Sequence, residues 1–239
     1  MEENVGVQVL VTANNASEHL NESLNSILPA VQDRPWVFIF HDDGSNDNTI
    51  DIAYSFAKRC NAASVVLERS HKSETIGIAK NKTFNLINPF RNKYPWVCVH
   101  DSDDLMYDTR INGLIGVAES TGCDFVYGSY NITSPKLNGR VSAQRQNELL
   151  GFGIWATIIH ESLIPESGAF FRTDMSVFED HAKWWDMRYV DGIDMIPAED
   201  VMTTNYIKRG ASVTLKPTRD QIEKLKSVRN KVYKHPLTH

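Results

Sequence analysis

The stretch Trp96-Val97-Cys98-Val99-His100-Asp101-Ser102-Asp103-Asp104 joins an apolar run to a dense acidic cluster. The apolar start predicts a buried strand, and the end places three carboxylates within four residues. Carboxylates so close together repel one another and add nothing to packing, but they are the ligands that hard cations such as Mg²⁺ and Mn²⁺ prefer. We therefore expect this strand to end at a site for a divalent cation.

A second acidic turn follows a second apolar run. Asp42-Asp43-Gly44-Ser45 comes after the run Trp36 to Phe40, and further apolar runs at 7–11 and 64–67 are separated by segments with helical spacing. Strands that alternate with helices at this rhythm predict a mainly parallel sheet wrapped by helices. In such sheets ligands bind beyond the carboxyl ends of the strands, so we expect both acidic turns to line one crevice.

The other expected elements follow from hydrophobic periodicity, N-cap residues and prolines. In the first half, helices are expected from Ser17, as N-cap, to Pro29, and at 50–57 and 78–87. In the second half, we expect strands at 125–130, 168–172 and 211–215, a polar connection at 134–145 and a helix at 199–208.

The composition is typical of one globular domain in a reducing compartment. The chain has 239 residues, 41% of them hydrophobic, which is enough for one substantial core. A net charge of −5 argues against binding to nucleic acids or membranes through total charge. The three cysteines lack metal-ligand spacing, and the sequence has neither a signal-peptide core nor an apolar run of about 20 residues. We expect a soluble, cytoplasmic protein with reduced thiols.

Four motifs follow one another along the chain: Asp42-Asp43-Gly44-Ser45-Asn46-Asp47-Asn48-Thr49, Gly77-Ile78-Ala79-Lys80-Asn81, Asp101-Ser102-Asp103-Asp104 and Glu199-Asp200. Together they resemble the motifs of family 2 glycosyltransferases, which have the GT-A fold and use nucleotide-diphospho-sugars. The resemblance covers residues 7 to 130 well and residues 165 to 210 more loosely.

The chain also departs from the family pattern. Val11-Thr12-Ala13-Asn14 lacks the proline and the tyrosine of the family's Pro-Thr-Tyr-Asn, and Lys80 replaces an arginine. The late Gln-x-x-Arg-Trp of processive members is absent. A polymerising synthase is therefore not expected.

The resemblance implies a GT-A (Rossmann-like) α/β fold with a mainly parallel central sheet flanked by helices and a smaller acceptor-side region. Residues 1–215 would form a single catalytic domain, in which 1–130 bind the nucleotide-sugar and 131–215 bind the acceptor. Residues 216–239 would form a basic C-terminal tail, with seven Lys or Arg against one Asp and one Glu.

The resemblance also assigns roles on the donor side. Asp103 would ligate the Mn²⁺ or Mg²⁺ ion that bridges the phosphates as a Lewis acid, and Asp101 would contact the ribose or reach the metal through water. Asp43 would accept from the imide N–H of uracil, which makes a UDP-sugar the expected donor, although aspartates in such turns commonly cap helices. The expected nucleotide-sugar-binding residues are Thr12, Asn14, Asp43, Lys80, Asp101 and Ser102.

On the acceptor side, the resemblance makes Asp200 the general base that deprotonates a hydroxyl for in-line, inverting attack. Glu199 would support it. The same segment, Pro197-Ala198-Glu199-Asp200, is also typical of a helix start, where the dipole favours acidic residues.

Aromatic and histidine side chains supply further candidates. Trp155, Trp184 and Trp185 would stack on an acceptor, although tryptophans are more often buried in a core. His160 and His235 are candidates for a late metal or phosphate contact.

Two alternative activities stay open. A sugar-phosphate nucleotidyltransferase has a related scaffold, but Thr12-Ala13-Asn14-Asn15 stands where its Gly-rich, Arg-containing phosphate loop is expected. A non-catalytic nucleotide-sugar-binding module would keep the motifs without turnover. The acceptor itself would be a saccharide, a lipid-linked sugar, a protein or, because the tail is basic, a modified nucleic acid.

Overall fold

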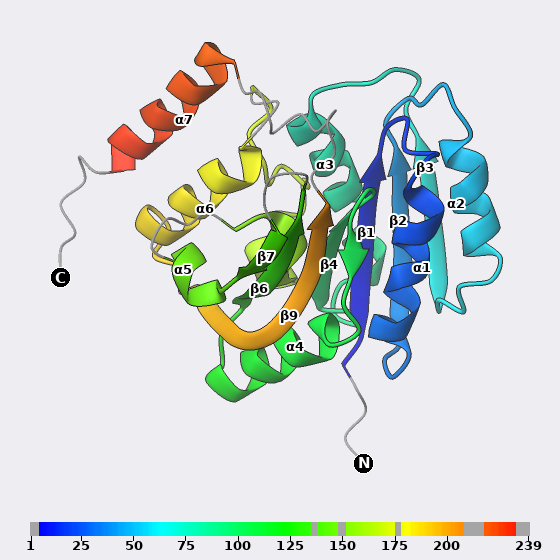
Figure 1. The fold of residues 1–239 in the computed structure, drawn as a ribbon, viewed down its shortest axis with the longest axis horizontal. Coiled ribbons are helices and arrows are strands. Elements are labelled where there is room, and N and C mark those ends of the chain that lie inside the picture. Colours follow the sequence, from blue (N-terminus) through cyan, green and yellow to red (C-terminus); the bar gives the residue numbers. More distant parts are fainter. Residues whose placement is uncertain (1–4, 135–137, 148–151, 175–177, 208–217, 233–239) are drawn as a thin grey trace.

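The computed structural model describes residues 5–134, 138–147, 152–174, 178–207 and 218–232 of the chain. Within these ranges a nine-stranded sheet runs in the order β3-β2-β1-β4-β8-β6-β9-β5, and β7 pairs with β6 outside this path (Figure 1). Helices cover both faces of the sheet. The predicted α/β class is therefore confirmed.

The first half of the sheet is parallel. In each of β1, β2 and β4 at most one residue is not fully buried, because helices exclude water from both faces. The apolar runs in the sequence predicted these strands, and each strand extends two residues further into its polar end. The four parallel strands are β1 (Val7–Ala13), β2 (Trp36–Asp42), β3 (Ser64–Arg69) and β4 (Trp96–Asp101).

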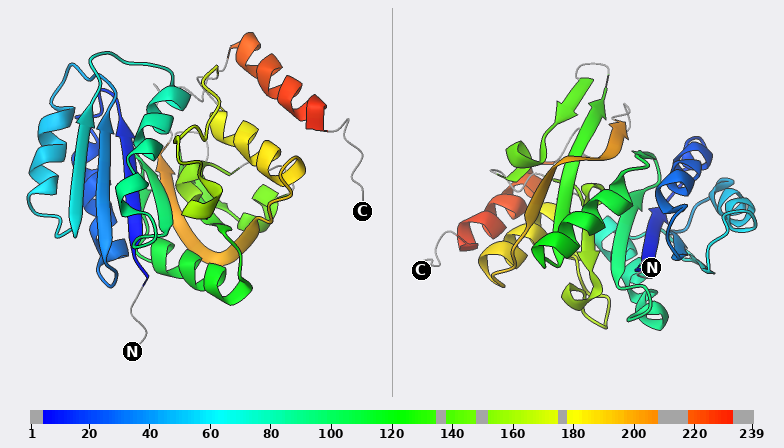
Figure 2. Two further views of the ribbon diagram at one scale, coloured as in Figure 1. Left: turned by 180° about the vertical axis from the view of Figure 1, so that it is seen from behind. Right: turned by 90° about the horizontal axis from the view of Figure 1, so that it is seen from below.

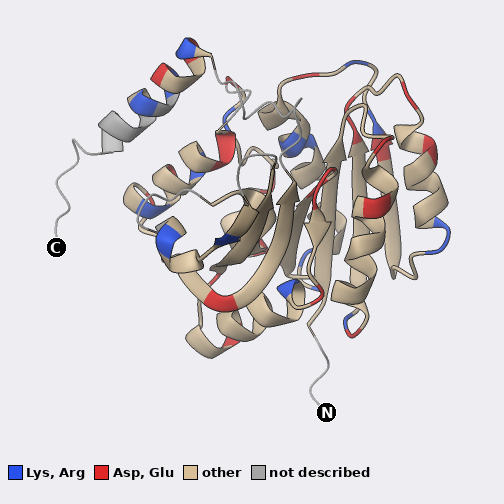
Figure 3. Ribbon diagram, in the orientation of Figure 1, with Lys and Arg blue, Asp and Glu red and all other residues tan. Residues whose placement is uncertain are grey.

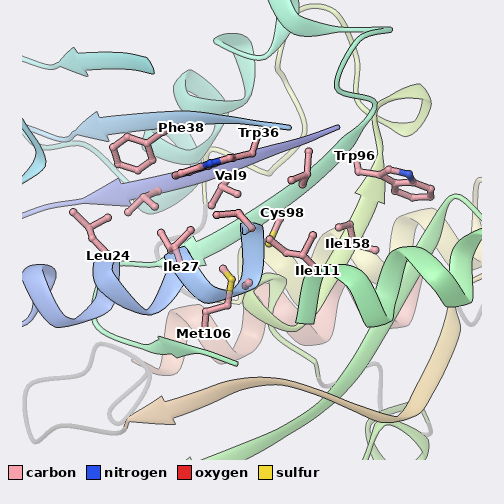
Figure 4. Close-up of a cluster of buried hydrophobic side chains, with 14 of the residues drawn as sticks. Val9, Leu24, Ile27, Trp36, Phe38, Trp96, Cys98, Met106, Ile111 and Ile158 are labelled. Carbon is pink, nitrogen blue, oxygen red and sulfur yellow. The ribbon is translucent and has the colours of Figure 1, made fainter. Parts of the chain in front are cut away.

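The helices divide between the two faces. α1, α2 and α4 pack on one face, and α3 packs on the other. Figure 4 shows part of the first core, in which Ile27 of α1 and Ile111 of α4 lie near Cys98 of the sheet. These helices are α1 (Leu20–Val31), α2 (Thr49–Ala57), α3 (Ile76–Asn85) and α4 (Arg110–Thr121).

The boundaries of α1 differ from the prediction. Its N-cap is His19 rather than Ser17, and Pro29 lies inside its last turn instead of ending it. Pro29 has no N–H, so the helix lacks the hydrogen bond from residue 29 to the carbonyl of Asn25, and it ends two residues later, at Val31.

The second half of the sheet is mixed. β8 lies between β4 and β6 and is antiparallel to both. None of the described helices is long and apolar enough to cross a membrane. The remaining elements are η1 (Asn88–Phe90), β5 (Leu105–Met106), β6 (Phe125–Thr133), β7 (Asn138–Val141), α5 (Ala143–Asn147), η2 (Ile154–Ala156), β8 (Thr157–His160), η3 (Glu161–Leu163), α6 (Glu179–Tyr189), β9 (Ile196–Ile207) and α7 (Arg219–Val232).

β9 is the long curved strand that closes this half. It pairs along its length with β6, and its end also pairs with the short β5, which follows the acidic cluster. Figure 2 shows the curl of β9 from behind and from below, with α7 beside α6 and away from the parallel strands. The end of β9 is thereby carried back to the region of β4.

Three predictions for the second half are wrong. Residues 134–145 were expected to form a polar connection, but they contain β7 and the start of α5. Residues 199–208 were expected to form a helix, but 196–207 form β9, because pairing on both sides with β6 and β5 outweighs a helical pattern that is rich in Thr, Val and Tyr. Residues 168–172 form no strand; Gly168 has a φ of +67°, and the segment runs irregularly across α3. The expected strand at 211–215 lies outside the described residues.

Candidate functional site

Three strand ends meet at one edge of the sheet. Thr12 of β1 is aligned with His41 of β2 on one side and with Asp101 of β4 on the other, and Ala13 is aligned with Asp42. This register puts the two acidic turns at the same edge of the sheet, one on each side of the end of β1. The edge therefore gathers the residues that the sequence assigned to the nucleotide-sugar.

The adjacent residues Asp42 and Asp43 have different roles. Asp42 is fully buried; its Oδ1 accepts from Ser45 N at 3.0 Å, and its Oδ2 lies 3.1 Å from Arg69 Nε. Asp42 therefore stabilises the turn, and Arg69 neutralises the charge of Asp42. Asp43 is 4% exposed, and its Oδ2 accepts from Ser73 Oγ and from Glu74 N, each at 2.9 Å.

The second oxygen of Asp43 is the notable atom. Its Oδ1 is buried and has no hydrogen-bond partner among the described residues. A buried acceptor without a partner is costly, and most such atoms in proteins are paired. An N–H group of a bound ligand would satisfy it.

Thr12, at the end of β1, and Asn14, just after it, make hydrogen bonds beside Asp43. Asn14 Nδ2 donates to Asp43 O at 2.7 Å, and Thr12 Oγ1 lies 2.8 Å from Thr83 Oγ1 of α3. Gly44 has a φ of +74°, and a Cβ on it would lie 2.5 Å from the carbonyl carbon of Lys72. The turn thus fits closely against the 72–74 loop, and only glycine suits this position.

The aspartates of the acidic cluster after β4 also differ in burial and in their contacts. Asp104 is fully buried, and its Oδ1 accepts from Ile207 N at 2.9 Å, so it ties the cluster to the end of β9. Asp101, Ser102 and Asp103 are only partly buried. The carboxylates left at the edge are therefore those of Asp101 and Asp103.

Asp101 stands among several charges. Burial raises the pKa of Asp101; the Lys80 ammonium opposes this shift, and the carboxylates of Glu179 and Asp180 add to it. Below the edge, the buried Arg110 donates from Nη2 to Val99 O at 2.7 Å and to Thr157 O at 3.0 Å, which joins β4 to β8. The guanidinium thus anchors the strand that carries the cluster.

The edge does not contain a preformed metal cage. Among the described residues, no group of three or more His, Cys, Asp or Glu side chains could hold a metal ion. Mg²⁺ in phosphate-transfer sites is commonly held by one or two carboxylates together with substrate phosphates. Asp101 and Asp103 therefore fit a cation that takes its other ligands from a diphosphate and from water.

Sequence reasoning missed two acidic residues at this edge, Glu179 and Asp180 in the first turn of α6. Lys80 Nζ lies 2.8 Å from Glu179 Oε1 and 3.9 Å from Asp101 Oδ1, and Asp180 Oδ2 accepts from Ile154 N at 3.2 Å. A signal was present, because Glu-Asp occurs here immediately before a segment with helical spacing.

The structure does not bring Glu199 and Asp200 to the edge. They lie where β9 bulges, between Ala198, which is aligned with Gly128, and Met202, which is aligned with Ser129. Asp200 is exposed, and Glu199 Oε2 accepts from Gln144 N at 2.8 Å. In Figure 3 the acidic band on β9 lies at the lower bend of the strand, whereas the acidic first turn of α6 lies at the upper end, near α3. The prediction that a helix starts at Glu199-Asp200 is therefore wrong: these residues lie in a bend of strand β9.

The three tryptophans are core residues in this structure. Trp184 is fully buried, and its Nε1 donates to Phe152 O at 2.8 Å. Trp155 stacks on Tyr206, and Trp155 and Trp185 are 8% and 9% exposed. Because a fully buried ring cannot stack on an acceptor, the assignment of Trp184 as an acceptor contact is corrected to packing.

His160 does not reach the edge either. His160 is aligned with Trp96 at the amino end of β4, so it lies at the opposite end of the strand from Asp101. Its Nδ1 lies 2.9 Å from Ser162 Oγ. His235 lies outside the described residues.

Comparison with known proteins establishes the class. The model of glycosyl transferase family 2 matches residues 8–182, and the chain belongs to this family. The family and the fold that the sequence motifs indicated are thus confirmed. No protein with a curated description matches the chain.

Solved structures show the same fold at low identity. S. aureus TarS 1-349 in complex with UDP-GlcNAc is 14% identical with a TM-score of 0.76, over 97% of this chain and 68% of that chain. In another S. aureus TarS structure, the match covers 40% of that chain, at 13% identity, a TM-score of 0.71 and 97% of this chain. The mannosyltransferase PcManGT from Pyrobaculum calidifontis, in complex with GDP-Man and Mn²⁺, is 15% identical with a TM-score of 0.60, over 98% of this chain and 71% of that chain.

Proposed function

We propose that this glycosyltransferase moves a sugar from a UDP-sugar to a hydroxyl acceptor with the help of Mn²⁺ or Mg²⁺. The observation that carries the proposal is the unpartnered, buried Oδ1 of Asp43 in the same row of strand ends as Asp101. TarS and PcManGT, which share the fold, were solved with UDP-GlcNAc and with GDP-Man. Both ligands are nucleotide-diphospho-sugars.

The nucleobase follows from hydrogen-bond counting. Uracil offers one imide N–H, which matches the single open acceptor on Asp43. Cytosine presents an acceptor at the equivalent ring nitrogen and would face the carboxylate with like polarity. Guanine presents two neighbouring donors, of which Asp43 Oδ1 would satisfy one. Thymine carries the same imide N–H, so this count favours UDP and dTDP, and CDP is the least favoured pyrimidine nucleotide.

Asp101 and Asp103 would hold the divalent cation together with the diphosphate. The cation supplies Lewis-acid stabilisation of the diphosphate as it departs. Ser102, between them, would donate to the donor sugar or phosphate. Because two carboxylates leave most coordination positions of the cation to the diphosphate and water, metal binding and nucleotide binding should strengthen each other.

For the acceptor, we propose Asp180 as general base in place of Asp200. The first turn of α6 faces the charged edge, where Asp180 raises the pKa of Asp101, whereas Asp200 is exposed on the bend of β9. In the reaction, the acceptor proton moves to the Asp180 carboxylate while the new bond to the anomeric carbon forms and the bond to the diphosphate breaks. Attack from the face opposite the diphosphate inverts the anomeric configuration.

The test is calorimetric titration of UDP, GDP, dTDP, CDP and ADP, with and without Mn²⁺. The variants are Asp103→Ala and Asp43→Asn, and the matched controls are Asp108→Ala and Asp51→Asn, two exposed aspartates outside the edge. We expect Mn²⁺-dependent binding of UDP that is lost in Asp103→Ala and weakened about tenfold in Asp43→Asn. Failure of the wild type to bind any of the five nucleotides would refute the proposal.

Turnover separates an enzyme from a binding module. We expect slow release of sugar from the matching UDP-sugar in the presence of Mn²⁺, even without acceptor. Tight binding without any release would favour the binding module. The acceptor is then sought among saccharides, lipid-linked sugars, proteins and nucleic acids, and steep inhibition by salt would point to an anionic acceptor.

A further inference from the structure

One face of α3 forms hydrogen bonds with the segment that precedes α6. Asn81 Nδ2 donates to Phe171 O at 2.9 Å, and its Oδ1 accepts from Phe170 N at 3.1 Å and from Phe171 N at 2.7 Å. Thr75 Oγ1 donates to Thr173 O at 3.1 Å. The irregular segment 168–173 therefore receives from α3 the hydrogen bonds that a sheet would otherwise supply.

α3 and the 168–173 segment approach each other too closely for a residue larger than glycine at two positions. A Cβ on Gly77 would lie 2.1 Å from Arg172 O, and a Cβ on Gly168 would lie 2.6 Å from Asn85 N. Gly168 also has a φ of +67°, which favours glycine. Both glycines thus permit contact between α3 and the segment.

Lys80 completes this contact. It is 5% exposed, its Nζ lies 2.8 Å from Glu179 Oε1, and Glu179 is itself 5% exposed. Asp101 Oδ1 is further away, at 3.9 Å, and the ring centre of Phe171 lies 5.8 Å from Nζ. Burial opposes the charge of Lys80, but Glu179 and Asp101 more than compensate, so that the pKa of Lys80 is raised.

We propose that Lys80 is a positioning residue that makes no contact with the donor: its ion pair with Glu179 fixes the first turn of α6 against the strand edge that carries Asp101. This inference rests on the proposed function for its catalytic consequence. The motif Gly77-Ile78-Ala79-Lys80-Asn81 then acts as a clamp between the two halves of the molecule. The clamp holds Asp180 at a fixed place relative to Asp101.

The test compares Lys80→Met, Glu179→Leu and the double variant. If Lys80 positions α6, each single variant lowers kcat for release of sugar at least about tenfold, while the Kd for UDP changes less than about threefold. The double variant should be no worse than either single variant, because two residues that act through one contact are not additive. Lys80→Arg should recover most of the activity, and Lys58→Met, at the exposed end of α2, should have no effect.

The contrary result is equally definite. If Lys80 binds the donor, Lys80→Met raises the Kd for UDP at least about tenfold and Glu179→Leu does not. That pattern, or losses that multiply in the double variant, would overturn the proposal. Should Lys80→Met fail to fold because it leaves Glu179 buried without its partner, the double variant with two apolar side chains still reports on the contact.

A structural readout makes the test independent of the donor. Hydrogen exchange of the α6 amides should accelerate at least about tenfold in both single variants, and exchange in α2 should not change. Unchanged exchange in α6 would overturn the positioning role. If the wild type bound no nucleotide, the proposed function would fail, while this measurement would still decide whether Lys80 and Glu179 hold α6.

Discussion

The two halves of the sheet are built from opposite kinds of contact. In the half formed by β1 to β4, the four strands pair in parallel with one another, and helices lie between them in the chain. In the other half, β8 enters between β4 and β6, and β9 pairs with β6 and β5, which precede it by about 70 and 100 residues. The first half carries the residues that we propose bind the donor, and the proposed general base, Asp180, comes from the second half.

The two Glu-Asp pairs show what this difference does to identical residues. Glu179-Asp180 opens a helix beside Asp101, whereas Glu199-Asp200 lies in a strand bulge. Each pair follows a hydrophobic residue or a proline and looks like a helix start in isolation. The neighbouring strands, and not the dipeptide, decide which pair reaches the site.

The strongest test replaces each of the two aspartates by asparagine in a separate variant. Asp180→Asn should lower kcat about 1,000-fold, because removal of a general base commonly costs two to four orders of magnitude. Asp200→Asn, at the exposed bend of β9, should lower kcat less than about threefold. Both are measured as transfer rates at saturating donor. The opposite order of effects would return the base to β9.

A stability test compares a glycine of the clamp with a glycine in the first half. Gly77→Ala should reduce the free energy of unfolding by at least about 2 kcal/mol, because its Cβ would lie 2.1 Å from Arg172 O. Gly116→Ala in α4, where a Cβ meets nothing within 4 Å, should instead increase it by about 0.5 kcal/mol. Urea unfolding measures both. Equal stability of the two variants would show that α3 and the 168–173 segment are not in close contact.

Trp184→Phe distinguishes packing from acceptor binding in the second half. The change leaves Phe152 O without its donor, and we expect a loss of about 1.5 kcal/mol in the free energy of unfolding. The KM for the acceptor should stay the same, because the ring is fully buried. A raised KM with unchanged stability would place Trp184 at the acceptor.

The smallest effect concerns pH and the first half. Burial lowers the pKa of His100 from 6.5 to about 3. Between these pH values the imidazole is protonated in the unfolded chain and neutral in the folded chain. Stability from this group is present above pH 6.5 and is lost as pH falls toward 3; between pH 7 and 5.5 the loss is about 1 kcal/mol. Urea unfolding at both pH values measures it, and His100→Gln should reduce the loss by that amount. An identical loss in the variant would contradict the assignment.

Much of the donor side could be predicted from the sequence. The strand ends at Thr12, Asp42 and Asp101 were expected at one edge, and the register aligns them. The resemblance also assigned the contact with the base to Asp43 of this pair. It could not show that Asp43 keeps one buried oxygen without a partner, because that depends on Ser73 and Glu74 some 30 residues away.

The sequence by itself determined the family, the parallel half of the sheet and the acidic strand ends, because local periodicity and short motifs encode strands that lie next to the helices following them. Only the tertiary structure decided that Lys80 pairs with Glu179, that β9 is a strand and that Trp184 is core. These facts depend on contacts between residues far apart in the chain, and no local pattern records which partner a segment finds. Burial and strand pairing therefore fixed the acceptor side, where sequence patterns alone gave the wrong elements.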